Sequence, residues 1–181
     1  RAWASARATS TAKASSSAEW PPPAAPSPSP PASPPPGDGG LAGVRRRYHC
    51  PMARTVSLGT PPQKLQDASD VICEGIAAAL EAAKPGATCA EVELAWRRVL
   101  AKSGFEKESR IGYSVGLNYP PDWGEHTMSL RPGDATVIQP NMTFHMIPGL
   151  MLDDCGIEIS ECFRITETGS ACFYDFPREM V

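Results

Sequence analysis

The order of the secondary-structure patterns predicts an α+β domain, in which an antiparallel sheet packs against helices. Strand-like runs rich in β-branched and aromatic residues open the folded part of the chain, two stretches of helical periodicity follow, and several further short strands end it. Strands and helices that are segregated along a chain are typical of α+β proteins, whereas regular alternation of strand and helix would predict a parallel sheet.

The 181 residues divide into two parts of different composition. Residues 1–40 are mostly Ala, Ser and Pro, with ten prolines between Pro21 and Pro36. Such a segment cannot bury enough apolar surface to offset its ordering entropy, so we expect residues 1–40 to be disordered. Their basic, hydroxyl-rich start fits an organellar transit peptide, and a plain low-complexity linker fits equally well. Residues 41–181 are long enough for one domain with a hydrophobic core.

Charge and cysteine usage exclude several classes of partner. The chain has 17 basic and 20 acidic side chains, and its basic residues cluster only at 45–47, so no nucleic acid is expected. No run approaches the roughly 18 apolar residues of a membrane-spanning helix, so no membrane is expected. The six cysteines show no spacing typical of zinc sites or disulfides. We therefore expect reduced thiols in an intracellular, cytoplasmic protein, or an organellar one if residues 1–40 are a transit peptide.

The first elements of the domain follow from local patterns. Residues 44–58 predict two strand segments that are joined or bulged at Pro51. Residues 62–84 carry apolar side chains at three-to-four spacing and predict a helix. Residues 88–91 form a capping-box motif, which opens a second helix that ends at Gly104.

After residue 108 the pattern changes to short strands, predicted at 111–117, 136–138, 142–147, 157–166 and 172–176, with a hairpin turn at 167–169. Alternation along 142–147 places Phe144 and Met146 toward the helices and His145 on the opposite face. Along 157–166 the same alternation places Glu158 and Glu161 on different faces. Because a buried carboxylate is costly without a partner, at least one of the two should meet a donor or a ligand.

Five motifs, in order, resemble a known family. They are YHCPMARTVSLG, GYSVGLNYPPDWGE, LRPGD, PNMTFHMIPG and GIEISECFRIT, and all lie within residues 41–181. Together they resemble the C-terminal half of the pita-bread fold shared by creatinase, aminopeptidase P and methionine aminopeptidase. The sequences YPPDWGE and FHMIPG are most similar to those of the ectoine hydrolases of that group. The resemblance implies that residues 41–181 are a partial catalytic domain with an incomplete pita-bread fold, and that the protein is a homodimer.

The resemblance also bears on metal binding. In the metallopeptidases of this family two Asp, one His and two Glu hold a pair of metal ions. Four of these positions correspond to Pro51, Tyr113, Ile147 and Ser160 of this chain. Proline and isoleucine side chains carry no donor atom, and neutral Tyr and Ser oxygens are weak ligands for divalent cations. We therefore predict that the protein uses no metal and no other cofactor.

The function implied by the resemblance is metal-independent hydrolysis of a C–N bond in a small cyclic amidine such as ectoine, which opens to N-acetyl-diaminobutyrate. Attack at the amidine carbon needs a base or nucleophile and a proton donor, for which the candidates are His145, Glu158 and Glu161. Aromatic side chains suit a cation with delocalised charge, and an arginine suits its carboxylate. The predicted substrate-binding residues are Tyr113, Tyr119, Trp123, Glu125 and Arg110.

Two other functions stay open. The fold alone allows a metallopeptidase of the Xaa-Pro aminopeptidase kind. The resemblance places a glutamate of ectoine hydrolases at Gly40, and the N-terminal domain of the family has no counterpart in residues 1–40. Both departures favour a catalytically inactive remnant that binds a ligand or a protein partner. The individual residues have structural alternatives too, since His145 could be a hydrogen-bonded strand histidine and His49 a side chain on a strand face.

Overall fold

The computed structural model describes residues 37–118 and 122–181. The chain divides into two units, 1–31 and 32–181, and all that follows concerns the described part of the second. The first 36 residues lie outside the described ranges, so disorder there stays a prediction. The elements are β1 (Gly37–Arg45), β2 (Tyr48–Val56), α1 (Gln63–Ala82), α2 (Cys89–Leu100), β3 (Gly112–Val115), β4 (Gly124–Leu130), β5 (Thr143–Met146), β6 (Leu150–Met151), β7 (Gly156–Ile157), β8 (Glu161–Ile165) and β9 (Ser170–Cys172).

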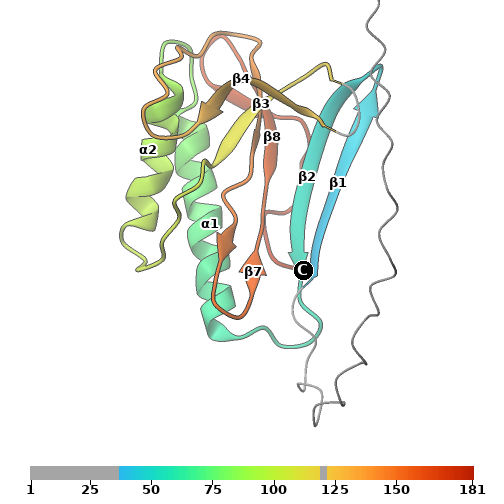
Figure 1. The fold of residues 1–181 in the computed structure, drawn as a ribbon, viewed down its shortest axis with the longest axis vertical. Helices are drawn as coiled ribbons and strands as arrows, with labels where there is room; N and C mark the ends of the chain where they lie inside the picture. Colours follow the sequence, from blue (N-terminus) through green and yellow to red (C-terminus); the bar gives the residue numbers. More distant parts are fainter. Residues whose placement is uncertain (1–36, 119–121) are drawn as a thin grey trace, which may run out of the picture. The chain divides into compact units, whose positions relative to one another are not determined.

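The described strands form antiparallel sheets, and the predicted α+β class is confirmed. Strands β4-β3-β5-β8-β9, in this spatial order, make a five-stranded sheet, while β1-β2 and β6-β7 are separate two-stranded sheets. Figure 1 shows α1 and α2 on one side of the five-stranded sheet and the β1-β2 hairpin on the other side. No helix in the described ranges is long and apolar enough to cross a bilayer.

The predicted division into two strand segments, joined or bulged at Pro51, is wrong. Strand β2 runs through Pro51, which pairs with Ala42 of β1. The chain turns instead at Arg46 and Arg47, whose φ angles of 51° and 70° lie in the left-handed region. A proline is tolerated within a two-stranded sheet because its missing N–H can lie on the side away from the partner strand.

Both helices form in the predicted segments, but α2 ends at Leu100 rather than at Gly104. Helix α1 lies within 62–84, and α2 begins with the predicted capping box, in which Thr88 accepts a hydrogen bond from the Glu91 backbone N–H and Glu91 accepts one from that of Thr88. The helices pack closely where Gly75 of α1 faces Trp96 of α2. A Cβ atom added to Gly75 would lie 2.4 Å from the Trp96 side chain.

Replacing Gly75 by Ala is therefore expected to destabilise the domain by about 1–3 kcal/mol, the usual cost of overpacking a filled core. Urea unfolding followed by circular dichroism would measure it. Because alanine favours helix over glycine, a neutral or stabilising result would show that Trp96 moves aside at little cost.

The strand predictions after residue 108 hold in part. Strands β3 and β5 lie within the predicted runs 111–117 and 142–147. The predicted strand at 136–138 is wrong, because this segment binds the loop between the helices: Ile138 N–H donates to Ala87 O at 2.8 Å, and the Gly86 N–H donates to Ile138 O. The run 157–166 is divided into β7 and β8, and β9 ends at Cys172 rather than beginning there. Strand β4 was not predicted, since its sequence GEHTMSL is polar and alternates weakly.

The alternation predicted for β5 is confirmed. Phe144 and Met146 are buried in the hydrophobic core with α1 and α2, so His145 between them projects from the opposite face of the sheet. The hairpin is joined to the five-stranded sheet at Ala53, whose backbone N–H donates to Ser160 Oγ at 2.7 Å and whose carbonyl accepts from the Ser160 N–H at 3.1 Å. The sheet face that carries His145 thus continues toward β2.

Candidate functional site

A tyrosine–histidine pair occupies the sheet face opposite the helices. Tyr113 of β3 and His145 of β5 are opposite one another in register, and the Tyr113 hydroxyl lies 2.8 Å from His145 Nδ1. The rings meet edge to face, with centroids 5.3 Å apart. His145 is only 2% exposed, and its Nε2 has no hydrogen-bond partner among the described residues. A buried polar nitrogen of this kind is a candidate ligand contact.

Two further predicted residues hold the Tyr113 ring. Trp123 Nε1 donates to the Tyr113 hydroxyl at 2.8 Å. The Arg110 guanidinium carbon lies 4.7 Å from the Tyr113 ring centroid, a cation–π contact, and its Nη1 donates to Ser129 Oγ at 3.1 Å. The structure thus brings Arg110, Tyr113, Trp123 and His145 together. The Arg110 guanidinium contacts the Tyr113 ring and Ser129.

The hydrogen bonds indicate the tautomer of His145. An indole N–H can only donate, so the Tyr113 oxygen accepts from Trp123. The tyrosine's own proton is then best placed on the side of His145 Nδ1. Burial lowers the pKa of His145 to about 4, so the imidazole is neutral near pH 7. With Nδ1 accepting, the neutral ring carries its proton on Nε2, which becomes a donor without an acceptor in the described part of the chain.

This lowered pKa predicts a pH dependence of stability. Between the unfolded pKa of 6.5 and the folded pKa of about 4, the unfolded chain binds more protons at this site than the folded one. The free energy of unfolding should therefore fall as pH falls through that window. Comparing the pH–stability curves of the wild type and His145→Gln isolates the contribution. Equal slopes, or an NMR titration midpoint of His145 near 6.5, would contradict the burial argument.

The carboxylate of Glu161 has another partner. Glu161 is 1% exposed and accepts a 2.9 Å hydrogen bond from Arg54 Nη2, while Arg178 Nε lies 3.5 Å from the same oxygen. The expectation that one of the two acids meets a donor is thus fulfilled. In register Glu161 is opposite Met146, so alternation directs it away from the face of His145. Its catalytic role stays a prediction that this geometry does not favour.

The remaining predicted residues lie around this face. Glu158 lies between β7 and β8, where its backbone N–H donates to Thr55 Oγ1 at 2.8 Å. Glu125 of β4 lies against Gly116, since a Cβ atom on that glycine would come 2.7 Å from its Oε1. Tyr119 lies outside the described residues, so its predicted role is untested.

The residues at the family's metal positions do not form a metal site. Pro51 and Ile147 offer no donor atom, and Ser160 Oγ accepts from the Ala53 N–H. The Tyr113 hydroxyl is bonded to Trp123 and His145. In the described ranges, no group of three or more His, Cys, Asp or Glu side chains is arranged to hold an ion. The donor chemistry present does not fit the two-metal centre of the metallopeptidases.

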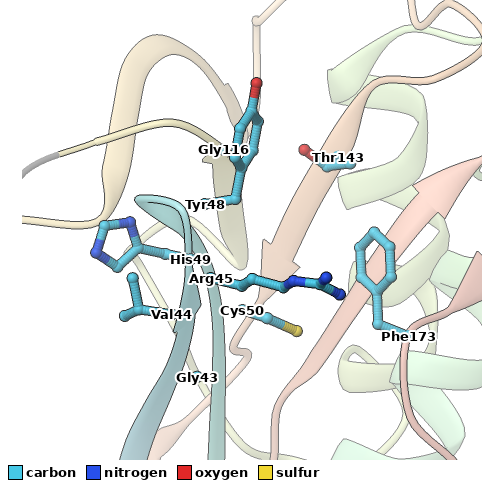
Figure 2. Close-up of a pocket in the computed structure, with 9 residues that line it drawn as sticks. All are labelled: Gly43, Val44, Arg45, Tyr48, His49, Cys50, Gly116, Thr143 and Phe173. Carbon is cyan, nitrogen blue, oxygen red and sulfur yellow. The ribbon is translucent and has the colours of Figure 1, made fainter.

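A cavity of about 760 Å³ adjoins the hairpin. Figure 2 shows Arg45 and Cys50 pointing toward Phe173 on one side of the hairpin and His49 pointing to the other side. Thr143 also lines the cavity and, two residues before His145 on β5, shares its sheet face. The lining residues are Gly43, Val44, Arg45, Tyr48, His49, Cys50, Gly116, Thr143 and Phe173.

Sequence reasoning missed two residues of this region. Arg54 forms the buried ion pair with Glu161, and a long charged side chain inside the strand motif MARTV was the available signal. His49 was interpreted only as a strand-face residue. It is 7% exposed, and its Nδ1 has no hydrogen-bond partner within the described part of the chain.

Comparison with known proteins places the chain in a family. The profile of metallopeptidase family M24 matches residues 41–167. The ectoine hydrolase of Halomonas elongata is 50% identical over 141 residues, which are 77% of this chain and 35% of that protein. A Xaa-Pro dipeptidase of Lactobacillus helveticus is 32% identical over 132 residues, 70% of this chain and 34% of that protein. The prolidase of Pyrococcus horikoshii superposes with a TM-score of 0.72 at 26% identity, covering 80% of this chain and 41% of that one.

The chain therefore belongs to metallopeptidase family M24. Its fold is the pita-bread fold in incomplete form, and the resemblance to ectoine hydrolases is confirmed. The chain spans about a third of the length of the curated relatives it matches. The activity known for whole relatives thus comes to this chain only as a proposal.

Proposed function

We propose that this chain is a metal-independent hydrolase that opens a small cyclic amidine of the ectoine type at a C–N bond. The observation that carries the proposal is the buried His145 Nε2, which lacks a partner among the described residues and lies on a face without a metal-binding donor set. The 50% identity to a protein named ectoine hydrolase supports the choice of substrate.

The chemistry assigns distinct roles to the residues. Water adds to the amidine carbon, one ring C–N bond breaks, the water oxygen becomes the carbonyl of the acetamide, and the departing nitrogen takes up the released protons. Once water has added to the amidine carbon, the Nε2–H of neutral His145 donates a hydrogen bond to the departing nitrogen, and Tyr113 fixes the ring in that tautomer. The aromatic rings of Tyr113 and Trp123 offer faces to the cationic amidine. Of the predicted acids, Glu158 is proposed to accept the proton of the attacking water. Glu161 is bonded to Arg54.

A catalytically inactive ligand-binding module is the second candidate function. It is favoured by Gly40, which occupies the position of the glutamate in ectoine hydrolases. Gly40 pairs with Ala53, and Ala53 is bonded to Ser160 of the five-stranded sheet. A glutamate at position 40 would restore the carboxylate that the resemblance expects there.

Incubation of the full chain with ectoine, followed by mass spectrometry for the ring-opened product, tests the proposal. The ectoine hydrolase of Halomonas elongata serves as positive control, and Gly40→Glu as a variant that restores the carboxylate. Product formation that persists with a chelator and without stoichiometric metal by elemental analysis supports the proposal. Turnover that chelation abolishes would refute metal independence. No product from the wild type or Gly40→Glu, while the control is active, would refute the hydrolysis and favour the binding module.

The predicted homodimer stays a proposal as well. Sedimentation velocity at several protein concentrations would test it, and a monomer at all concentrations would refute it.

A further inference from the structure

Two cysteine thiols contact one another next to the candidate site. The Cys50 side chain of β2 forms a hydrogen bond with the Cys162 side chain of β8. Cys162 is fully buried, whereas Cys50 is only partly buried, and both are free thiols. The two residues belong to segments that are far apart in the sequence, so the contact depends on how the β1-β2 hairpin packs against the five-stranded sheet.

Backbone contacts bring the two strands together at this level independently of the thiols. The Tyr174 hydroxyl accepts from the Cys162 N–H at 3.1 Å and lies 3.5 Å from Pro51 O. The hairpin is joined to the sheet again at Ala53, two residues further along β2. These contacts therefore hold Cys50, the neighbour of Pro51, against Cys162.

The buried thiol of the pair lies beside His145. Cys162 is opposite His145 in register. Its N–H donates to the Tyr174 hydroxyl and its carbonyl accepts from the Phe173 N–H at 2.9 Å, so neither of these backbone groups bonds to β5. Opposite residues without mutual backbone bonds are those whose side chains come closest in an antiparallel pair. A change at the Cys162 sulfur therefore changes the surroundings of the His145 ring.

The other thiol of the pair is reached from the cavity of about 760 Å³, which Cys50 lines. Figure 2 shows the Cys50 sulfur pointing toward Phe173, on the same side of the hairpin as Arg45. Thr143, which shares the sheet face of His145, lines the same cavity. A small reagent in this cavity thus meets the Cys50 sulfur at the wall.

We propose that Cys50 and Cys162 are an oxidation site, at which a small peroxide converts the two thiols into a disulfide beside His145. The Cys50 thiolate attacks one oxygen of hydrogen peroxide, the O–O bond breaks, and the departing hydroxide takes up a proton to become water. The Cys162 sulfur then attacks the sulfenic Cys50 sulfur, the S–O bond breaks, and the leaving hydroxide takes the Cys162 proton to give a second water. The two sulfurs together lose two electrons, which the peroxide oxygens gain. The inference goes beyond the proposed hydrolysis and does not depend on it.

The surroundings assign different roles to the two thiols. Burial raises the pKa of Cys50, and the hydrogen bond with Cys162 acts against that shift. Burial also raises the pKa of Cys162, and there the contact with Cys50 and the charge of Glu161 raise it further. Because the thiolate is the nucleophile, Cys50 is the thiol that attacks the peroxide, and Cys162 completes the disulfide.

Cys172 is a third thiol near Cys162, and its position in the sheet argues against it as the partner. Cys172 is opposite Phe163 in register, and directly opposite residues share a face. Because Phe163 and Cys162 are neighbours on β8, Cys172 lies on the sheet face opposite to that of Cys162. Its sulfur accepts instead from Arg178 Nη2 at 3.5 Å.

Peptide mapping of the full chain after peroxide treatment tests the inference. The reduced, folded protein is exposed to hydrogen peroxide, the remaining thiols are blocked with iodoacetamide, and the digest is analysed by mass spectrometry without reduction. We expect a linked peptide of Cys50 and Cys162 that dithiothreitol separates again. Since the pKa of Cys50 is raised from its ordinary value of 9.0, the thiolate fraction and the rate of linkage should rise about tenfold from pH 7 to pH 8.

Three variants control the assignment of the linked peptide. Cys50→Ser and Cys162→Ala should each abolish it. Cys155 is partly exposed and lies between β6 and β7, so Cys155→Ser is the matched control and should leave the link in place. No linked peptide from the folded wild type, or one that joins Cys162 to Cys172, overturns the inference.

The His145 imidazole signal gives a second readout by NMR. It should shift on oxidation and return on reduction, and a static signal in the linked protein would overturn the placement of the disulfide beside His145. A chain that forms the disulfide but does not open ectoine refutes the proposed hydrolysis and leaves the inference standing. A chain that opens ectoine but forms no link between Cys50 and Cys162 does the reverse.

Discussion

Replacing His145 by Gln should lower kcat for ectoine ring opening by about 100-fold or more, the range associated with loss of a positioned acid–base group. Glutamine keeps an amide donor of similar reach, but it lacks the ring nitrogen Nδ1 through which the Tyr113 hydroxyl holds the imidazole in place. Because the lost interaction is made to the reacting amidine, kcat should fall more than KM rises. Steady-state kinetics with product detection by mass spectrometry would measure both parameters.

The Tyr113→Phe variant separates the orientation of the His145 ring from the contact that His145 itself makes with the substrate. It removes the hydroxyl that contacts His145 Nδ1 and accepts from Trp123, while the ring under Arg110 remains. We expect a smaller loss of kcat than for His145→Gln and a changed pH profile, since the imidazole loses its tautomer control. If His145→Gln retains full turnover while the protein stays folded, His145 is a structural strand histidine and the proposed mechanism is wrong.

The parts of the fold that the sequence predicts are those with strong local patterns. Apolar spacing placed α1, and the Thr88–Glu91 capping box placed the start of α2. Strand β4 was not predicted because it is stabilised by pairing with β3, and its own sequence shows little alternation of apolar and polar residues. The segment 136–138 resembled a strand because its residues are β-branched, yet it pairs with the inter-helix loop. Propensity cannot reveal such non-local partners.

The sequence predicted which residues lie at the candidate site better than it predicted their hydrogen-bond and ion-pair partners. Alternation alone placed His145 on the sheet face opposite to that of Phe144. A buried carboxylate was expected to accept a hydrogen bond. Which donor it finds depends on the hairpin, because Arg54 reaches Glu161 from a strand more than one hundred residues earlier. The commitment of Arg110 to the Tyr113 ring depends in the same way on the packing of β3 against β4. Contacts between elements distant in sequence decide which polar groups are left for a ligand.

Replacing Arg54 by Met should reduce the free energy of unfolding by about 3–5 kcal/mol, the usual cost of removing one partner from a buried ion pair. Arg54 is 5% exposed and Glu161 1%, so neither charge can be rehydrated without opening the structure. The guanidinium also donates to the carbonyls of Ala53 and Ser160, which join the hairpin to the five-stranded sheet. Methionine keeps the volume of the stem but leaves Glu161 and both carbonyls without this donor.

Urea unfolding of four variants separates the ion pair from a catalytic role of Glu161. Glu161→Gln alone should also destabilise, whereas Arg54→Met combined with Glu161→Gln should lose less than the sum of the single changes, because no unpaired charge remains buried. Arg164→Ala is the matched control, since Arg164 is exposed and bonded to Asn141, and it should change stability by no more than about 0.5 kcal/mol. A Glu161→Gln variant that keeps wild-type stability but has lost all turnover would contradict a purely structural role of Glu161. Its carboxylate would then be needed for the reaction and not for holding the hairpin against the five-stranded sheet.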